Sequence, residues 1–178
     1  MYLIILLIIT IVLFFVIVFL SVQLFNICFR GYAPFISTKP KIIANILREI
    51  NLQPNDKVYE LGCGKAGFLN AICKKFPKVK AIGVENAPWP YFLAQIQATL
   101  LNKNIKIIRK NLFNINLSDA NLIYCYLNLK TMDKLKEKFN KECKSGAIII
   151  SYQFPMHNIN PQKIIQLDKD KVYFYKIA

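Results

Sequence analysis

The sequence predicts an α/β fold, in which helices cover both faces of a mostly parallel sheet and one apolar helix precedes the folded domain. The first observation is that short apolar segments of strand length alternate with segments whose apolar residues recur at helical spacing. The second is that two strand-like segments follow each other at the end of the chain, which indicates an antiparallel hairpin. The third is an uninterrupted apolar run at the start of the 178 residues.

The apolar run extends from Leu3 to Phe29 without a charged residue. A bilayer core needs roughly 20 apolar residues in a helix, so residues 1–29 are predicted to form one transmembrane anchor. A cleaved signal peptide would be shorter and would begin with basic residues. Because Arg30 and Lys39 follow the run and no basic residue precedes it, we expect a single-pass protein of the cell membrane with its folded domain in the cytoplasm.

Residues 30–56 are predicted to form a linker and an N-terminal helix, and residues 57–178 one folded domain. The domain has five segments with the length and apolar content of buried strands: Lys57–Leu61, Val79–Glu85, Ile105–Lys110, Ala120–Leu127 and Gly146–Tyr152. Helices are predicted between them, one of which is marked by the apolar stripe Trp89, Phe92, Leu93, Ile96 and Leu100. The closing hairpin is predicted to turn at Lys169–Asp170.

Composition leaves several partners open. The formal net charge of +14 suits nucleic acid, but it equally suits an anionic membrane surface or the codon bias of a low-GC genome. The five cysteines are scattered and odd in number, without a C-x-x-C pair or a cluster with histidine. We therefore predict neither a metal site nor a disulfide framework.

The segment "VYELGCGKAGFL" has the pattern of a strand, a glycine-rich turn and a helix. Gly62, Gly64 and Gly67 allow a tight turn and a close approach of backbone to a ligand. The free N–H groups at the start of the following helix, expected near Lys65, favour a negatively charged ligand group. This pattern predicts a site for a nucleotide-like cofactor.

Two acidic residues indicate which cofactor binds. Glu85 ends the second predicted strand, where an acid accepts hydrogen bonds from two ribose hydroxyls. Glu60 lies two residues before the first glycine of the turn. Its carboxylate would repel a diphosphate and attract the ammonium group of S-adenosylmethionine, so we predict S-adenosylmethionine as the cofactor.

Several segments of the chain resemble those of a known family. "E-L-G-C-G" and "G-V-E" look like the first two motifs of class I methyltransferases. Together with the apolar N-terminus, the segments "PFISTKPKIIANIL", "ENAPWPYFLAQ" and "YCYLN…SGAIIISYQFPMHN" resemble the small membrane-anchored protein-lysine methyltransferases. This family includes mitochondrial enzymes that modify the adenine nucleotide translocase and the ATP synthase c-subunit, and prokaryotic relatives. The resemblance implies a Rossmann-like class I methyltransferase sheet with a C-terminal antiparallel hairpin.

The resemblance also implies a set of residues around the cofactor. These are Thr38 in the linker, Glu60, Gly62, Cys63 and Gly64 at the glycine turn, Glu85 and Asn86 after the second strand, and Asn111 after the third. In this family pattern Ala66 stands where the third glycine is usual, and alanine fits there if its φ is negative. Asn111 stands where an acid usually contacts the adenine, and its carbonyl could still accept from the exocyclic amino group.

The acceptor is expected at the carboxyl ends of the fourth and fifth strands, because parallel sheets bind ligands there. We predict that its wall consists of Tyr126, Asn128, Tyr152 and Phe154, with Tyr124 and Tyr126 on one face of the sheet. His157, the single histidine, is interpreted as incidental, and no general base is evident. The resemblance implies a lysine of a protein near the membrane surface as the acceptor, methylated by direct displacement.

Other functions remain open. The anchor is compatible with methylation of a lipid or quinone headgroup, and the charge with an RNA methyltransferase. The end of the fourth strand reads Leu127-Asn128-Leu129-Lys130 and lacks the Asn/Asp-Pro-Pro-Tyr/Phe motif of nucleic-acid amino-methyltransferases, which argues against methylation of a base. A non-catalytic basic binding module is supported only by Ala66.

Overall fold

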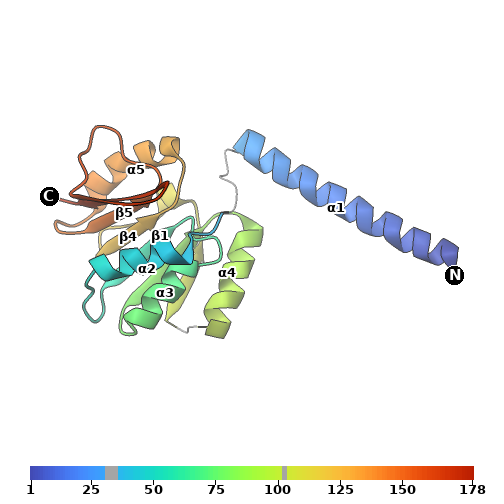
Figure 1. The fold of residues 1–178 in the computed structure, drawn as a ribbon, viewed down its shortest axis with the longest axis horizontal. Coiled ribbons are helices and arrows are strands. Elements are labelled where there is room, and N and C mark those ends of the chain that lie inside the picture. The colour runs from blue at the N-terminus through green and yellow to red at the C-terminus, as the bar shows by residue number, and fades with distance from the viewer. Residues whose placement is uncertain (31–35, 102–103) are drawn as a thin grey trace. The chain divides into compact units, whose positions relative to one another are not determined.

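The computed structural model describes residues 1–30, 36–101 and 104–178, and it divides the chain into two compact units, Met1–Pro34 and Phe35–Ala178. The first unit contains the helix α1 (Tyr2–Arg30), drawn in blue in Figure 1. Within α1, the stretch Tyr2–Val22 is long and apolar enough to cross a membrane. Its large apolar side chains are exposed on all sides of the helix, as in a segment that has no protein core to pack against.

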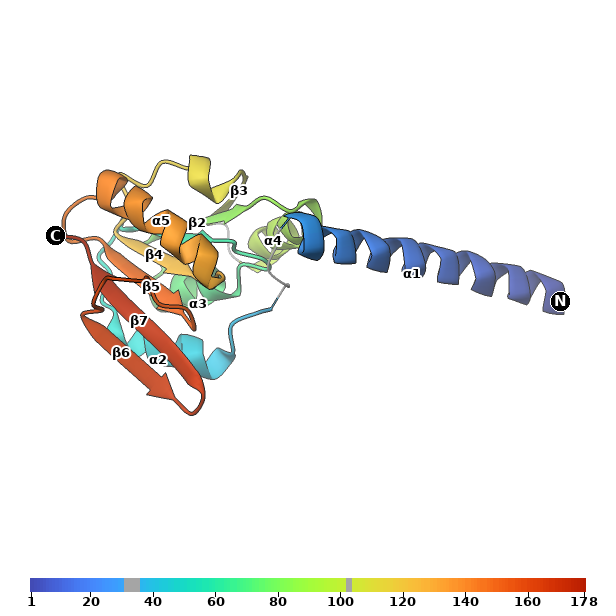
Figure 2. The same ribbon diagram turned by 90° about the horizontal axis from the view of Figure 1, so that it is seen from above.

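The second unit is built on a sheet of seven strands in the order β3-β2-β1-β4-β5-β7-β6 (Figures 1 and 2). The strands are β1 (Lys57–Leu61), β2 (Lys80–Glu85), β3 (Ile105–Arg109), β4 (Leu122–Cys125), β5 (Ile148–Tyr152), β6 (Lys163–Leu167) and β7 (Asp170–Lys176). The first five are parallel, and β7 enters antiparallel between β5 and β6. This arrangement confirms the predicted mostly parallel sheet with a C-terminal antiparallel hairpin.

Helices cover both faces of the sheet, as predicted. One face packs against α2 (Pro40–Glu49), α3 (Gly67–Lys75) and α4 (Pro88–Leu101) in a first hydrophobic cluster. The other face packs against α5 (Leu129–Glu142) in a second cluster, beside the short 3-10 helix η1 (Leu112–Asn114). Figure 2 separates these layers, with α5 on one side of the sheet and α2 and α3 on the other. The strand order reverses between β1 and β4, and parallel sheets bind ligands at the carboxyl ends of the strands beside such a reversal.

Some predicted boundaries are wrong at element ends. The β4 strand is confined to Leu122–Cys125, shorter at both ends than expected. The hairpin turns at Asp168 and Lys169 instead of Lys169–Asp170, because Asp168 takes the positive φ of 56° that a two-residue hairpin turn needs. Asp170 consequently opens β7 and pairs with the last residue of β6. The division of the chain at residues 29 and 56 stays a prediction.

Candidate cofactor and acceptor site

The turn after β1 is fixed by its glycines and by the end of β2. Gly62 and Gly64 have φ values of 71° and 52°, a region that L side chains rarely adopt. The N–H groups of Gly62 and Cys63 both donate to the Val84 carbonyl, over 2.8 and 3.1 Å. A Cβ on Gly62 would lie 2.9 Å from Leu127 Cδ2. Glycine is therefore required at this position both by the backbone conformation and by the close side chain of Leu127.

The condition under which alanine would fit at position 66, a negative φ, is not met. Ala66 has φ 56° and ψ 34°, which places it in the left-handed region just before the first residue of α3. Its N–H donates to the Cys63 carbonyl over 2.6 Å, and its carbonyl accepts from Asn70 N over 3.0 Å. Both backbone groups of Ala66 are thus hydrogen-bonded. Its left-handed conformation lowers the stability of the folded state by about 1 kcal/mol relative to a glycine at this position. The helix α3 begins at Gly67 rather than near Lys65.

Glu85 joins the glycine turn to the beginning of α4. One carboxylate oxygen, Oε2, accepts from Gly64 N over 3.1 Å, and the other, Oε1, accepts from Ala87 N over 2.9 Å. The half-buried carboxylate therefore holds both loops at the carboxyl end of β2. Asn86 is exposed directly beside it. This is where the sequence places the ribose of the cofactor, and that role stays a prediction.

Glu60 is a buried acid at the carboxyl end of β1. Its Oε2 accepts from Leu69 N over 3.4 Å, and no ion pair among the described residues includes it. Burial, with a smaller contribution from the charge of Glu85, raises the pKa of Glu60 to about 8. A buried carboxyl that lacks a cationic partner suits the ammonium group of an amino-acid-like ligand, since the opposite charge would compensate for its desolvation.

Thr38 connects the segment before α2 to β4. Its hydroxyl lies 2.6 Å from the hydroxyl of Tyr124, which is fully buried and stacks on Phe68 with 4.0 Å between the ring centroids. Tyr124 pairs in register with Glu60 on the neighbouring strand. Thr38 thus reaches the strand pair that holds Glu60. Pro34 and Phe35, which begin the same linker motif, lie outside the described residues.

Two of the four predicted acceptor residues come together. The rings of Tyr126 and Tyr152 lie 4.5 Å apart between centroids, and Tyr126 packs with Tyr124 against the first cluster, as the alternation of the strand predicts. Phe154 packs instead against the second cluster, on the α5 side of the sheet. Asn128 caps α5, where its side-chain oxygen accepts from Thr131 N over 2.9 Å. A wall made by all four side chains stays a prediction, and Tyr126 and Tyr152 are its best-supported part.

Asp170 is a residue of this region that the sequence did not reveal. Its Oδ1 accepts from the Tyr152 hydroxyl over 2.8 Å and from Gln153 Nε2 over 2.5 Å, and its Oδ2 accepts from Lys39 Nζ over 2.8 Å. The hydrogen bond from Lys39 is the main reason why the pKa of Asp170 is lowered. An acid in a hairpin gives no local signal of such contacts, because 131 positions separate Asp170 from Lys39.

Two predicted cofactor residues have structural partners. Asn111 caps η1, where its side-chain oxygen accepts from Phe113 N over 3.0 Å, so the adenine contact stays a prediction. The thiol of Cys63 is buried, and a Cβ on Gly83 would lie 2.8 Å from its sulfur. Burial raises the pKa of Cys63, which keeps the thiol neutral. Neither residue offers a nucleophile.

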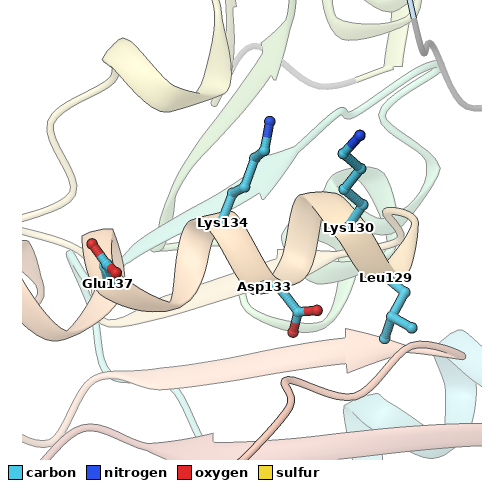
Figure 3. A pocket seen from close by; sticks show the side chains of 5 residues that line it. All are labelled: Leu129, Lys130, Asp133, Lys134 and Glu137. Carbon is cyan, nitrogen blue, oxygen red and sulfur yellow. The ribbon is translucent and has the colours of Figure 1, made fainter.

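A separate hollow lies along α5, with a volume of about 560 Å³. Leu129, Lys130, Asp133, Lys134 and Glu137 line it, and Figure 3 shows the two lysines projecting from one side of the helix. His157 lies beside this helix, with its Nδ1 2.8 Å from Asp133 Oδ2. Neither Glu60 nor Glu85 lines this hollow, so it is separate from the predicted cofactor site at the glycine turn.

The sequence of the chain is similar to those of known proteins. The model of the ANTKMT methyltransferase domain matches residues 60–163 of the chain. A protein-lysine N-methyltransferase of Saccharolobus islandicus (strain REY15A) is 28% identical over 153 residues, covering 83% of this chain and 95% of that protein. The adenine nucleotide translocase lysine N-methyltransferase of Mus musculus is 25% identical over 152 residues, covering 83% of this chain and 65% of the mouse protein.

Solved structures share the fold at lower identity. An RNA methyltransferase from Salinibacter ruber, in complex with S-adenosyl-L-homocysteine, superposes with a TM-score of 0.76 at 21% identity, covering 80% of this chain and 94% of that one. The rRNA methyltransferase aviRa from Streptomyces viridochromogenes superposes with a TM-score of 0.63 at 10% identity, covering 82% and 88%. At these identities the superpositions establish the class I methyltransferase fold.

Proposed function

Since the chain belongs to the ANTKMT methyltransferase domain family, it is an S-adenosylmethionine-dependent methyltransferase, and we propose that its acceptor is a protein lysine at a membrane surface. The observation that supports the cofactor within the site is the buried Glu60 carboxyl beside the glycine turn. The lysine acceptor is supported by the names of two relatives, the protein-lysine N-methyltransferase and the adenine nucleotide translocase lysine N-methyltransferase.

The residues at the turn fit the parts of this cofactor. Glu60 would balance the ammonium of its methionine part, and the open backbone of Gly62 and Gly64 would line the same part. Glu85 would accept from the ribose hydroxyls, in addition to the backbone N–H groups that it already holds. When bound, the cofactor supplies an activated methyl group to a nucleophile. The protein has to align that nucleophile and exclude water.

The acceptor has to arrive as a neutral amine. A lysine has a reference pKa of about 10.4, and an apolar aromatic surrounding favours loss of its proton. The half-buried Tyr126, which packs against the buried ring of Tyr152 on the same face of the sheet as Tyr124, would offer such a surface. Burial and the hydrogen bond to Asp170 raise the pKa of Tyr152 to about 12, so its phenol stays protonated and in place. These tyrosines would orient and desolvate the lysine, and no general base is assigned.

Membrane attachment is the second part of the proposal. The stretch Tyr2–Val22 would cross the bilayer once, and the basic residues after it would keep the folded unit in the cytoplasm. The acceptor would then lie close to the cytoplasmic surface of the cell membrane, on a membrane protein or a protein bound there.

Labelling of membranes tests the acceptor class. The full chain is incubated with membranes of its host cell and with S-adenosylmethionine labelled in the methyl group. We expect label in protein, recovered as methyl-lysine after hydrolysis, and strongly reduced label with the Glu60→Gln variant. Glu137→Gln, an exposed change on α5, is the matched control and should label as the wild type does. Label in the lipid extract or in RNA would contradict the lysine acceptor, but it would still agree with methyltransferase activity.

A further inference from the structure

The helix α4 exposes a row of large apolar side chains. Four residues at helical spacing have exposed fractions between 40% and 77%: Trp89 (55%), Phe92 (54%), Ile96 (40%) and Leu100 (77%). We call these four residues the α4 stripe. The rings of Trp89 and Phe92 are 6.1 Å apart between centroids, so the stripe is continuous at this end.

The stripe is not needed to attach α4 to the sheet. The residues of α4 buried against the sheet are Ala94 and Ala98, which pack with Ile105 and Ile107 of β3 in the first cluster. A helix on a sheet normally buries its large apolar residues and exposes polar ones. Here the two alanines and the partly buried Tyr91 face inward, and the four large apolar residues of the stripe face outward. Exposed apolar surface of this kind marks a site of contact with a protein, a ligand or a membrane.

The composition around the stripe favours a lipid surface as that phase. Tryptophan is enriched at the boundary between headgroups and acyl chains, where its ring finds apolar and polar surroundings together. Arg109 alternates with Ile105 and Ile107 along β3, so it lies on the sheet face that α4 covers, and it is exposed, as is Lys110 after it. Basic residues beside an apolar stripe attract anionic headgroups, and the chain as a whole has a net charge of +14.

The length of the chain also limits how far this surface can lie from a bilayer. The described part of the folded unit begins at Ile36, six residues after α1 ends at Arg30. Six residues span at most roughly 20 Å when fully extended. If α1 crosses the membrane as proposed, the folded unit therefore stays within reach of the bilayer surface. This step rests on the anchoring part of the proposed function.

We propose that the α4 stripe docks into the headgroup boundary of an anionic bilayer, with the helix axis in the membrane plane. Trp89 lies four residues after Glu85, at the end of α4 that follows directly from the cofactor site. Docking of this helix would hold the carboxyl end of β2 close to the membrane surface. The enzyme would then select lysines next to a membrane-spanning segment over lysines of proteins in free solution.

The single tryptophan of the chain makes the docking measurable, because Trp89 is the only source of tryptophan fluorescence. The full chain is reconstituted in vesicles of phosphatidylcholine and phosphatidylglycerol, with or without bromine on the acyl chains. We expect the Trp89 emission to shift to the blue and to be quenched by the brominated lipid. In the Phe92→Glu, Leu100→Glu double variant both effects should be lost. Ile164→Glu on β6, where the isoleucine is 52% exposed, is the matched control and should keep them.

The possible results separate this inference from the proposed anchoring. A chain that fails to float with the vesicles overturns the anchoring and the docking together, while methyl transfer to protein lysine remains open to its own test. A chain that floats but has unshifted, unquenched emission overturns only the docking. Emission that is blue-shifted but unquenched shows that protein covers the stripe, and it overturns the docking as well. Retained cofactor binding by each variant shows that it is folded.

Discussion

Replacement of Glu60 by glutamine should stabilise the cofactor-free protein at neutral pH and weaken cofactor binding at the same time. The carboxyl is buried at the end of β1, and its pKa is raised to about 8 from an ordinary value of 4.5. In the unfolded chain the group is ionised at pH 7, whereas in the folded protein it takes up a proton. At about 1.4 kcal/mol per pH unit, this difference costs about 3 kcal/mol of folding free energy at pH 7.

The sign of the pH dependence follows from proton uptake. Between pH 4.5 and 8 the folded state binds more protons at Glu60 than the unfolded state, so the stability of the wild type falls as the pH rises. Glutamine has no such titration. The amide can keep the hydrogen bond from Leu69 N, and any cost of its buried N–H₂ group is the same at every pH. The stability of Glu60→Gln relative to the wild type should therefore rise by about 3 kcal/mol from pH 4 to pH 7.

Thermal unfolding in one detergent across pH 4–9 measures this difference without cofactor. For a chain of this size, a change of 3 kcal/mol corresponds to roughly 6–12 °C in the melting temperature. Calorimetry at pH 7 in buffers of different ionisation enthalpy should show release of close to one proton when S-adenosylmethionine binds the wild type, and none for the variant. Parallel stability curves for the two proteins would refute the reasoning, since Glu60 would then ionise like an exposed acid. Glu137→Gln should leave both measurements unchanged.

Three further changes are informative. Gly62→Ala combines a positive φ with a contact of 2.9 Å, and it should lower the free energy of unfolding, measured by chemical denaturation, by about 1–3 kcal/mol. Gly67→Ala, with nothing within 4 Å of its Cβ, should be tolerated. Equal losses of stability in the two variants would contradict this account of the turn. Glu85→Ala leaves two backbone N–H groups without their acceptor and should weaken S-adenosylmethionine binding roughly 10- to 100-fold in calorimetry; unchanged affinity would remove Glu85 from the site. Asp170→Asn should destabilise the protein at neutral pH. Because the pKa of Asp170 is lowered, the difference in stability between variant and wild type should vanish as the pH falls below 3.8. A difference in stability that does not depend on pH would contradict the ion pair with Lys39.

Local sequence was sufficient for the strands and for the glycine turn. Strands of a parallel sheet are buried on both faces, so each appears in the sequence as a short apolar run. Such a run can be recognised without knowing which strands pair with it. Glu60 and Glu85 could be selected because each ends such a run. Their positions at the turn follow from the parallel pairing of β1 with β2, which the alternation of strands and helices already implied.

Other features could be read only from the folded chain. Ala66 has a positive φ while both its N–H and its carbonyl are hydrogen-bonded, a conformation that the usual preference of alanine does not indicate. The direction of the α4 stripe was not evident, because helical spacing shows that apolar residues share a face but not whether that face meets the sheet or the outside. Two alanines on the opposite side decide it here.

The sequence by itself thus determined the order of the elements, the apolar N-terminal helix, the glycine turn and the two acids that flank it. Most of these depend on neighbours within a few residues, and the position of Glu85 at the turn depends on the parallel pairing that the alternation of strands and helices implies. Only the tertiary structure decided that Asp170 joins Tyr152 to Lys39, that Thr38 meets Tyr124, and that Phe154 packs on the other side of the sheet. Such contacts join segments far apart in the chain, and their partners are set by strand pairing and layer packing, for which the local pattern has no signal.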